Sequence, residues 1–278
     1  MSAVSEPPTP RPQATSTDRP LRPAPRPWRG FTSLAMRECL RVARLWTQTV
    51  LAPVVSSGLF ILVFGLSLGG RIRGVSDFDY EVFIVPGLIA MAMAQAAYAN
   101  NSSSLFQARS DRYVNDVLSA PMRAWQMHVG FSAGGWFRAL AIGIALAAVA
   151  MPITGTPIRE PVALVFGVVL LVTLFGALGV IVGIYAENWD NAAFINNVVI
   201  LPLAFVGGVF YSIDILPSPW EEISHLNPLF YLVNLVRYGF LGESDISIAL
   251  CFAVTISIAV VLVAWAQHLF SSGHRLKP

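Results

Sequence analysis

The sequence predicts an all-α integral membrane protein. We expect six transmembrane helices, an N-terminal amphipathic interface helix and a re-entrant helical hairpin between the fifth and sixth spans. Hydrophobic residues make up 55% of the chain and charged residues only 12%. The charged residues leave long apolar windows between them, and the arginines collect in alternate connections. Because backbone polar groups must be paired within the segment in lipid, apolar windows of this length are expected to be helices.

The six spans correspond to windows of about 20 apolar residues, the length that crosses the hydrocarbon core of a bilayer. We expect them over residues 47–69, 82–105, 127–151, 161–186, 191–212 and 246–270. The third window is interrupted by one charged residue, Arg138, and the others contain no charge.

A further apolar run extends from Ile223 to Val236. It is too short to cross a bilayer, and Pro228 breaks it. We therefore expect an outer re-entrant hairpin over residues 214–243. A seventh, short span is the alternative.

The distribution of the arginines indicates on which side of the membrane each segment between the spans lies. Most of them lie before the first span, between spans two and three, or after the sixth span. Cytoplasmic loops of membrane proteins are enriched in basic residues, so we expect both termini to be cytoplasmic. The net charge of +2 is distributed by membrane side rather than in one patch, which predicts no nucleic-acid partner.

The N-terminal segment, residues 1–28, is rich in proline and arginine and has few large apolar side chains. Such a segment cannot bury enough surface to offset its ordering entropy, so we expect a disordered cytoplasmic tail. It also lacks the apolar core of a signal peptide. Residues 29–278 are then expected to form one transmembrane domain.

Two segments outside the spans are predicted to be structured. Residues 31–46 combine an apolar stripe with an arginine stripe at helical spacing, which is typical of a helix in the membrane interface. Glu38 lies within the apolar stripe, either as a simple i,i+3 partner of Arg41 or as the buried partner of another cation. Residues 107–126 predict a short charged helix and a proline turn that protrude into the cytoplasm.

Polar side chains inside the spans need protein or water partners, because lipid offers none. We expect an intramembrane polar group, which would line a pathway on the hypothesis that the protein is a transporter, formed by Gln95, Tyr98, Asn100, Asn101, Arg138, Asn196 and Asn197. Glu187, Asp190 and Glu38 are candidate partners for Arg138, and the sequence does not choose among them. Static packing in a receptor or structural protein is the competing interpretation of the whole group.

Several kinds of chemistry are not expected. The single lysine, Lys277, follows no glycine-rich loop, so the chain should contain no Walker A site for ATP. Cys39 and Cys251 are far apart and the four histidines are scattered, so no metal site and no catalytic set is expected. A membrane enzyme would require such a set. A gradient-driven secondary transporter is the main alternative, although only Arg138 is charged at depth and no inverted repeat is evident.

An ordered set of motifs resembles the ABC-2 type exporter permeases, the membrane subunits of ABC transporters. After the interface helix come FIVPGLIAM at 83–91, LSAPM at 118–122, Arg138, GGVFYSIDILPSPW at 207–220 and NPLFYLVNLVRYGFLG at 227–242. The last two motifs are the most specific. The resemblance covers roughly residues 30–270 and is closest to the branch of the nodulation-factor and daunorubicin-type permeases.

The resemblance implies a permease that exports an amphipathic, drug-like, lipid-linked or glycan cargo across the bacterial plasma (inner) membrane. It implies a second permease copy, expected here to form a homodimer, and contact with membrane lipid. A separate ABC ATPase would bind ATP and Mg, so this chain would bind no cofactor and catalyse no reaction itself.

The resemblance implies two functional sites in this chain, each at specific residues. It assigns coupling to the ATPase to Glu38, Arg41, Arg109, Asp111, Arg112, Asp116 and Pro121. It places Asn227, Pro228 and Arg237 in an outer gate.

Overall fold

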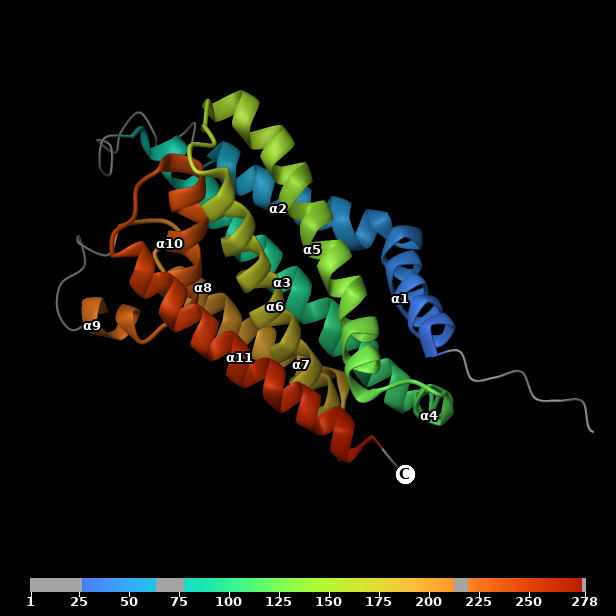
Figure 1. Cartoon of the computed structure of the whole chain (residues 1–278). Coiled ribbons are helices and arrows are strands. Elements are labelled where there is room, and N and C mark those ends of the chain that lie inside the picture. Colours follow the sequence, from blue (N-terminus) through green and yellow to red (C-terminus); the bar gives the residue numbers. More distant parts are fainter. Residues whose placement is uncertain (1–26, 64–77, 213–219, 277–278) are drawn as a thin grey trace, which may run out of the picture.

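Every regular element is a helix in the computed structural model, which describes residues 27–63, 78–212 and 220–276 (Figure 1). In chain order the elements are α1 (Pro27–Arg44), η2 (Thr47–Leu51), α2 (Ala52–Phe60), α3 (Tyr80–Ser110), α4 (Val114–Ser119), α5 (Ala124–Thr154), α6 (Pro161–Tyr185), α7 (Trp189–Phe194), η4 (Ile195–Ile200), α8 (Leu201–Val206), α9 (Trp220–His225), α10 (Pro228–Leu241) and α11 (Ile248–Ser272). Residues 1–26 of the expected tail lie outside the described residues, as do residues 64–69 of the expected first span.

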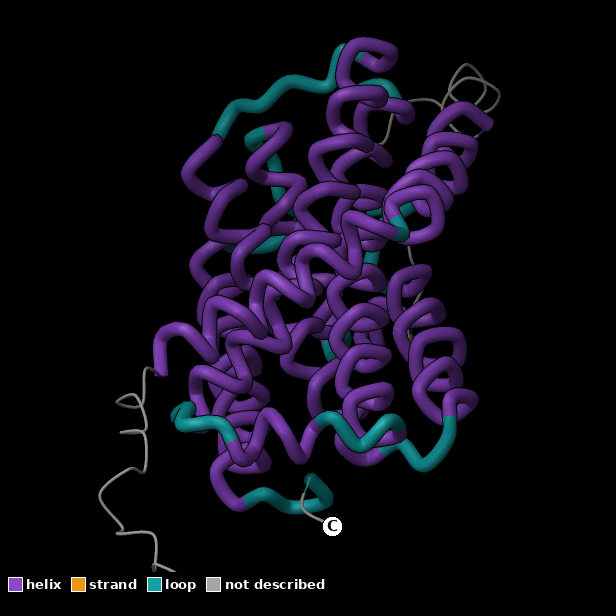
Figure 2. The backbone as a smooth tube through the Cα atoms, turned by 90° about the vertical axis from the view of Figure 1, so that its right-hand side faces the viewer, coloured by secondary structure: helices purple, strands orange, loops and turns teal. Residues whose placement is uncertain are grey.

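The helices long and apolar enough to cross a membrane are α3, α5, α6, α11 and the continuous run Trp189–Val206. The first two helical segments, Trp28–Arg44 and Thr47–Val63, meet the same criteria only when taken together and are bent by 74°, so counting the pair as one span gives up to six crossings. In Figure 2 most of the described loops lie at the two ends of the bundle. This arrangement confirms the predicted all-α membrane fold, and the bend between the N-terminal helix and the first span is consistent with the expected interface helix.

Helix α3 is the central element of the bundle and packs against α5, α6 and α10. In its most apolar stretch 89% of the residues are buried. Its contact with α6 is made backbone to backbone, because Gly179 and Gly183 of α6 carry no side chain. A Cβ atom at Gly179 would lie 2.5 Å from the carbonyl oxygen of Tyr98, and one at Gly183 would lie 2.7 Å from that of Ser102. Small residues four apart are a common device for close helix packing in membranes.

The first span begins with a π-helical turn, η2, followed by Pro53. In an α-helix the Thr49 carbonyl would accept a hydrogen bond from the N–H of residue 53, which proline lacks. Arg138 of α5 supplies a donor instead, through Nε at 2.9 Å from the Thr49 oxygen. The intramembrane charge therefore stabilises the irregular start of the first span.

The described part of the expected re-entrant hairpin contains α9 and α10, and residues 214–219 of the predicted range lie outside the described residues. Asn227 caps α10, since its Oδ1 accepts from the N–H of Leu229 at 2.9 Å, and Pro228 occupies the first helical turn. Helix α10 rises about 21 Å, less than the ~30 Å hydrocarbon core. At its other end, the carbonyls of Gly239 and Phe240 accept from the backbone of the α5–α6 connection. It therefore stays at one end of the bundle, which disfavours a seventh span.

The opposite end of the bundle carries the start of α1, the helix α4 and the end of α11 (Figure 1). Trp28 of α1 contacts Trp125 of α5 there, with ring centroids 5.9 Å apart. We refer to these two ends as the α4 end and the α10 end.

Replacing Gly179 with leucine should separate α3 from α6 and destabilise the protein, by about 3 kcal/mol or more, since overpacking of a tight contact is costly. Thermal stability of the detergent-solubilised protein, followed by size-exclusion chromatography, measures the effect. Gly58→Leu is the matched control, because a Cβ at Gly58 meets no atom within 4 Å. Equal stability of the two variants would contradict the assigned packing.

The substitution Arg138→Leu should abolish assembly or transport in the wild-type sequence. In a Pro53→Ala background the loss should be smaller, because residue 53 then donates to the Thr49 carbonyl. A thermal-stability double-mutant cycle should show a coupling of about 1 kcal/mol. Strictly additive effects would mean that Arg138 acts elsewhere.

Candidate functional site

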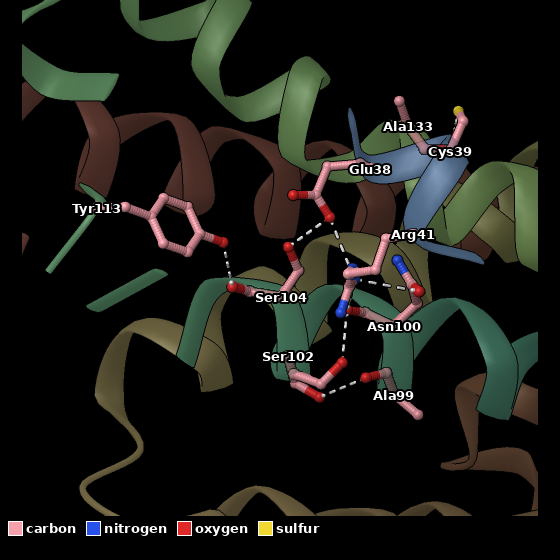
Figure 3. Close-up of polar contacts among 10 residues, drawn as sticks. Glu38, Cys39, Arg41, Ala99, Asn100, Ser102, Ser104, Tyr113 and Ala133 are labelled. Carbon is pink, nitrogen blue, oxygen red and sulfur yellow. Dashed lines mark hydrogen bonds and ion pairs between the residues drawn. The ribbon is translucent and has the colours of Figure 1, made fainter. Parts of the chain in front are cut away.

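A buried polar cluster joins α1 to α3 at the α4 end; we call it the α1–α3 junction (Figure 3). Glu38 is fully buried, and its Oε2 accepts a hydrogen bond from Ser104 Oγ at 2.6 Å. The same oxygen lies 3.1 Å from Arg41 Nη2. Glu38 is thus the i,i+3 partner of Arg41, and it also fastens the interface helix to the second span.

Arg41 extends this junction toward the bilayer. Its Nη2 donates to the backbone oxygen and to Oδ1 of Asn100, both at 3.3 Å. Both contacts of the carboxylate are made by Oε2, whereas Oε1 of Glu38, Nε of Arg41 and Nδ2 of Asn100 are buried without a hydrogen-bond partner among the described residues. The junction holds α1 in one position on α3.

Tyr113, between α3 and α4, connects the protruding loop to the same junction. Its hydroxyl donates to the Ser104 carbonyl at 3.4 Å, and the Arg37 guanidinium lies over its ring at 3.8 Å from the centroid. Burial raises the pKa of the Tyr113 phenol, so the group remains a neutral donor. Both parts expected to meet an ATPase, α1 and the loop, are therefore joined to α3.

The expected coupling residues divide into inward and outward groups. Glu38 is buried, and Arg109 donates through Nη1 to the carbonyls of Gly183 and Ala186 at 3.2 and 3.0 Å, at the end of α6. The exposed members are Asp111, Arg112, Asp116 and Pro121. Arg112 has a positive φ of 60°, which turns the chain between α3 and α4. Only the exposed group has side chains free to meet another protein.

The expected intramembrane polar group does not form one site. Tyr98 donates to the Ala192 carbonyl at 2.9 Å, and Asn101 Nδ2 donates to the Gly176 carbonyl at 3.0 Å. Gln95 Nε2 is buried with no hydrogen-bond partner among the described residues. Asn100 belongs to the α1–α3 junction, and Arg138 belongs to the start of the first span.

Tyr98 does meet Asn196 and Asn197, at a pocket of about 150 Å³ between α3 and the α7–η4 segment. Asn196 Nδ2 donates to Asn197 Oδ1 at 3.1 Å, whereas Asn196 Oδ1 is buried without a partner in the described structure. Ser102, Ser103 and Trp189 also line the pocket. It offers amide and hydroxyl groups and no ionised side chain.

None of the three acids considered for Arg138 forms an ion pair with it in the described residues. Glu38 pairs with Arg41, and Glu187 lies 4.0 Å from Arg275. The sequence analysis considered only carboxylates as partners of Arg138 and overlooked a backbone carbonyl. The feature of the sequence that indicates this acceptor is Pro53, because it has no N–H to pair with the Thr49 carbonyl four residues earlier.

A second buried polar cluster lies at the α10 end and is centred on Arg237. Its Nη1 lies 3.2 Å from Asp245 Oδ2, and its Nη2 donates to the Gly208 carbonyl. The guanidinium also lies over the Phe83 ring of α3, at 3.9 Å from the centroid. Arg237 thus joins α10, the end of the fifth span, the start of α3 and the segment before α11.

Asp245 and Asn234 are residues of this cluster that sequence reasoning missed. Asn234 Oδ1 accepts from Ser244 Oγ and from the backbone N–H of Asp245, at 3.2 and 3.0 Å. An asparagine inside the apolar run and an acid just before the sixth span were the available signals. Asn227 lies deeper, where its Nδ2 donates to the Leu203 carbonyl of α8 at 2.6 Å.

The described residues contain no group of three or more His, Cys, Asp or Glu side chains that could hold a metal ion. The α1–α3 junction and the Arg237 cluster are built from side chains that fix helices to one another. The α1–α3 junction contacts α3 near Ser104 and the Arg237 cluster contacts it at Phe83, toward opposite ends of the helix.

Comparison with known proteins identifies the family of this chain. The sequence profile described as "ABC-2 type transporter" matches residues 29–241. "Inner membrane transport permease YadH" of Escherichia coli (strain K12) is 35% identical over 252 residues, covering 90% of this chain and 98% of the relative. "Nodulation protein J" of Rhizobium leguminosarum bv. viciae is 27% identical over 227 residues, covering 78% of this chain and 85% of the relative. The chain belongs to the ABC-2 type transporter family and is a membrane-spanning transport subunit.

Proposed function

We propose that the chain is the permease of an ATP-driven exporter in a bacterial inner membrane, with both termini in the cytoplasm. The family generally works with an ABC ATPase subunit, which would bind ATP and Mg. The cargo proposed is amphipathic, drug-like, lipid-linked or glycan. The name of the Escherichia coli relative, an inner membrane transport permease, supports the location.

The α1–α3 junction is the observation that carries this proposal. An external motor can drive a permease only if the surface that it contacts is mechanically joined to the spans. Glu38 and Tyr113 provide this join, because each connects a segment near the exposed loop to Ser104 of α3. Movement of α1 or of the loop would then be transmitted directly to the spanning helix α3, because these hydrogen bonds join the segments without a flexible linker between them.

Helix α3 extends this connection across the bilayer. It is a single helix of 31 residues, about 46 Å long. Ser104 lies near one of its ends, and Phe83, which lies under Arg237, near the other. A shift of α3 would therefore reach the proposed outer gate formed with Asn227 and Pro228.

We infer that two copies of the chain pair as a homodimer and that lipid covers the remaining surface. Helix α2 has no buried residue, and Val55 and Leu59 are each 60% exposed. Val198 and Phe205 of the fifth span are 52% and 45% exposed. These two segments carry large apolar faces that a second copy or lipid would cover.

Reversing the exposed charges Asp111→Lys and Arg112→Glu should reduce ATPase co-purification at least fivefold, because charge complementarity contributes about 1 kcal/mol or more at such contacts. The measurement is an affinity pull-down of the full chain from its native cells in mild detergent, with co-purifying proteins identified by mass spectrometry. Glu222→Lys at the α10 end is the matched control and should retain the partner.

The same pull-down tests the function itself. A stoichiometric ATPase with a Walker A loop supports the proposal. Purification of the wild-type chain without any ATPase in several detergents would instead favour gradient-driven transport.

Removing the junction carboxylate with Glu38→Ala should loosen α1 from α3. Loss of one partner from a buried pair costs about 3–5 kcal/mol. Cys39, half-buried against the Ala133 carbonyl, reports the opening by faster maleimide labelling in a Cys251→Ser background. Glu81→Ala should leave labelling unchanged, and an unchanged rate in Glu38→Ala would rule out the fastening role.

A further inference from the structure

A crevice of about 380 Å³ lies between α5, α6 and α11, away from both polar clusters. Its walls include the aromatic side chains of Trp125 and Trp136 and the polar side chains of His128, Ser132, Thr173 and Gln267. No Asp, Glu, Lys or Arg is among its lining residues. The volume is that of a site for a small organic ligand, and the lining suits an uncharged group.

Two hydroxyl groups in this crevice lack the usual intrahelical partner. Serine and threonine inside a helix commonly donate to a carbonyl one turn earlier. Thr255 does so to Cys251 at 2.7 Å, and Thr154 to Ala150 at 3.0 Å. Ser132 and Thr173 form no side-chain hydrogen bond with any described residue, and neither hydroxyl is sealed inside the protein. Both donors are therefore available to a ligand at membrane depth, where water cannot satisfy them.

The crevice also has a polar end and an apolar end. His128 and Gln267 lie about one helical turn from the α4-side ends of α5 and α11. Trp136 lies about 18 Å along α5 from its start. A molecule in this crevice would place its polar part near the membrane boundary and its apolar part toward the bilayer centre.

We propose that this α5–α6–α11 crevice binds one glycerolipid from the leaflet at the α4 end. An ester carbonyl accepts a hydrogen bond from Ser132, and an acyl chain packs along Trp136 toward Thr173 at the middle of α6. An ester carbonyl fits Ser132 because it is an uncharged acceptor that lies below the headgroup. The inference does not depend on what the permease transports or on what drives it.

Photo-crosslinking in membranes tests the site. The full-length chain carries p-benzoylphenylalanine at Val129, which lines the crevice and is 47% exposed. The matched control carries it at Ile144, which lies on the same helix, is 69% exposed and is not a lining residue. Cells grown on an alkyne fatty acid provide lipid that can be detected on the crosslinked chain. The adduct yield at Val129 should be several-fold higher than at Ile144.

Removing the Ser132 donor should weaken the signal. Ser132→Ala should lower the adduct at Val129 roughly fivefold, the equivalent of about 1 kcal/mol for the lost hydrogen bond. Thr173→Val, at the depth of the acyl chain, should leave the adduct unchanged. Ser257→Ala is the control, because this exposed hydroxyl already donates to the Ala253 carbonyl. The variants are compared only as monodisperse protein, so misfolding does not enter the result.

Three results would overturn the proposal. Equal adduct yields at Val129 and Ile144 would show bulk lipid contact only. A yield that persists in Ser132→Ala would show that Ser132 holds no ester carbonyl. A Val129 crosslink to a second protein chain would show that protein, not lipid, covers the crevice.

Discussion

Backbone carbonyls freed at helix breaks are the acceptors for three arginines of this bundle, the buried Arg237 and the half-buried Arg138 and Arg109. Lipid cannot satisfy such a carbonyl, so the protein must provide a donor. Arg138 donates to Thr49 at the start of the first span, and Arg237 donates to Gly208 after the fifth. Arg109 donates to Gly183 and Ala186 where α6 ends. Each arginine is tied to an irregular point of the backbone, so these charges have a structural explanation that does not require a cargo or an ion.

The breaks themselves recur in corresponding places. The first and the fifth spans each contain a π-helical turn followed by a proline, Pro53 after η2 and Pro202 after η4. These two spans are also among the least buried, whereas α3 and α6, joined through Gly179 and Gly183, are the most buried. The bundle thus combines a tightly packed centre with two irregular helices at its surface. A helix bends with the smallest loss of free energy at such local departures from α-helical geometry.

The fold class followed from the sequence because a bilayer leaves few options. Apolar windows between charges, the arginine distribution and a run too short to cross predicted the spans and the re-entrant hairpin. The partner of Arg138 was not predictable in this way, since every backbone carbonyl is a possible acceptor and sequence alone does not show which is free. Asp245 was overlooked for a similar reason: its contact with Arg237 depends on how α10 turns back into the bundle.

The candidate coupling residues also show that contacts between helices cannot be predicted from the sequence alone. Their charges suggested one surface, but Glu38 is buried and Arg109 is half-buried against the end of α6, whereas Asp111, Arg112 and Asp116 are exposed. Periodicity placed Glu38 on the apolar stripe without showing that Ser104 of another helix would meet it. Contacts between distant helices are set by their packing, which one sequence does not reveal.

The division between buried junction and exposed loop has an evolutionary consequence. Substitutions at Asp111, Arg112 or Asp116 change the outer surface without touching Glu38, Ser104 or Tyr113. With the proposed coupling role, recognition of a partner protein can diverge between duplicated genes while the proposed mechanical connection beneath it is kept. Related permeases in one cell would then acquire separate partners through a handful of surface changes, with no need to rebuild the membrane domain.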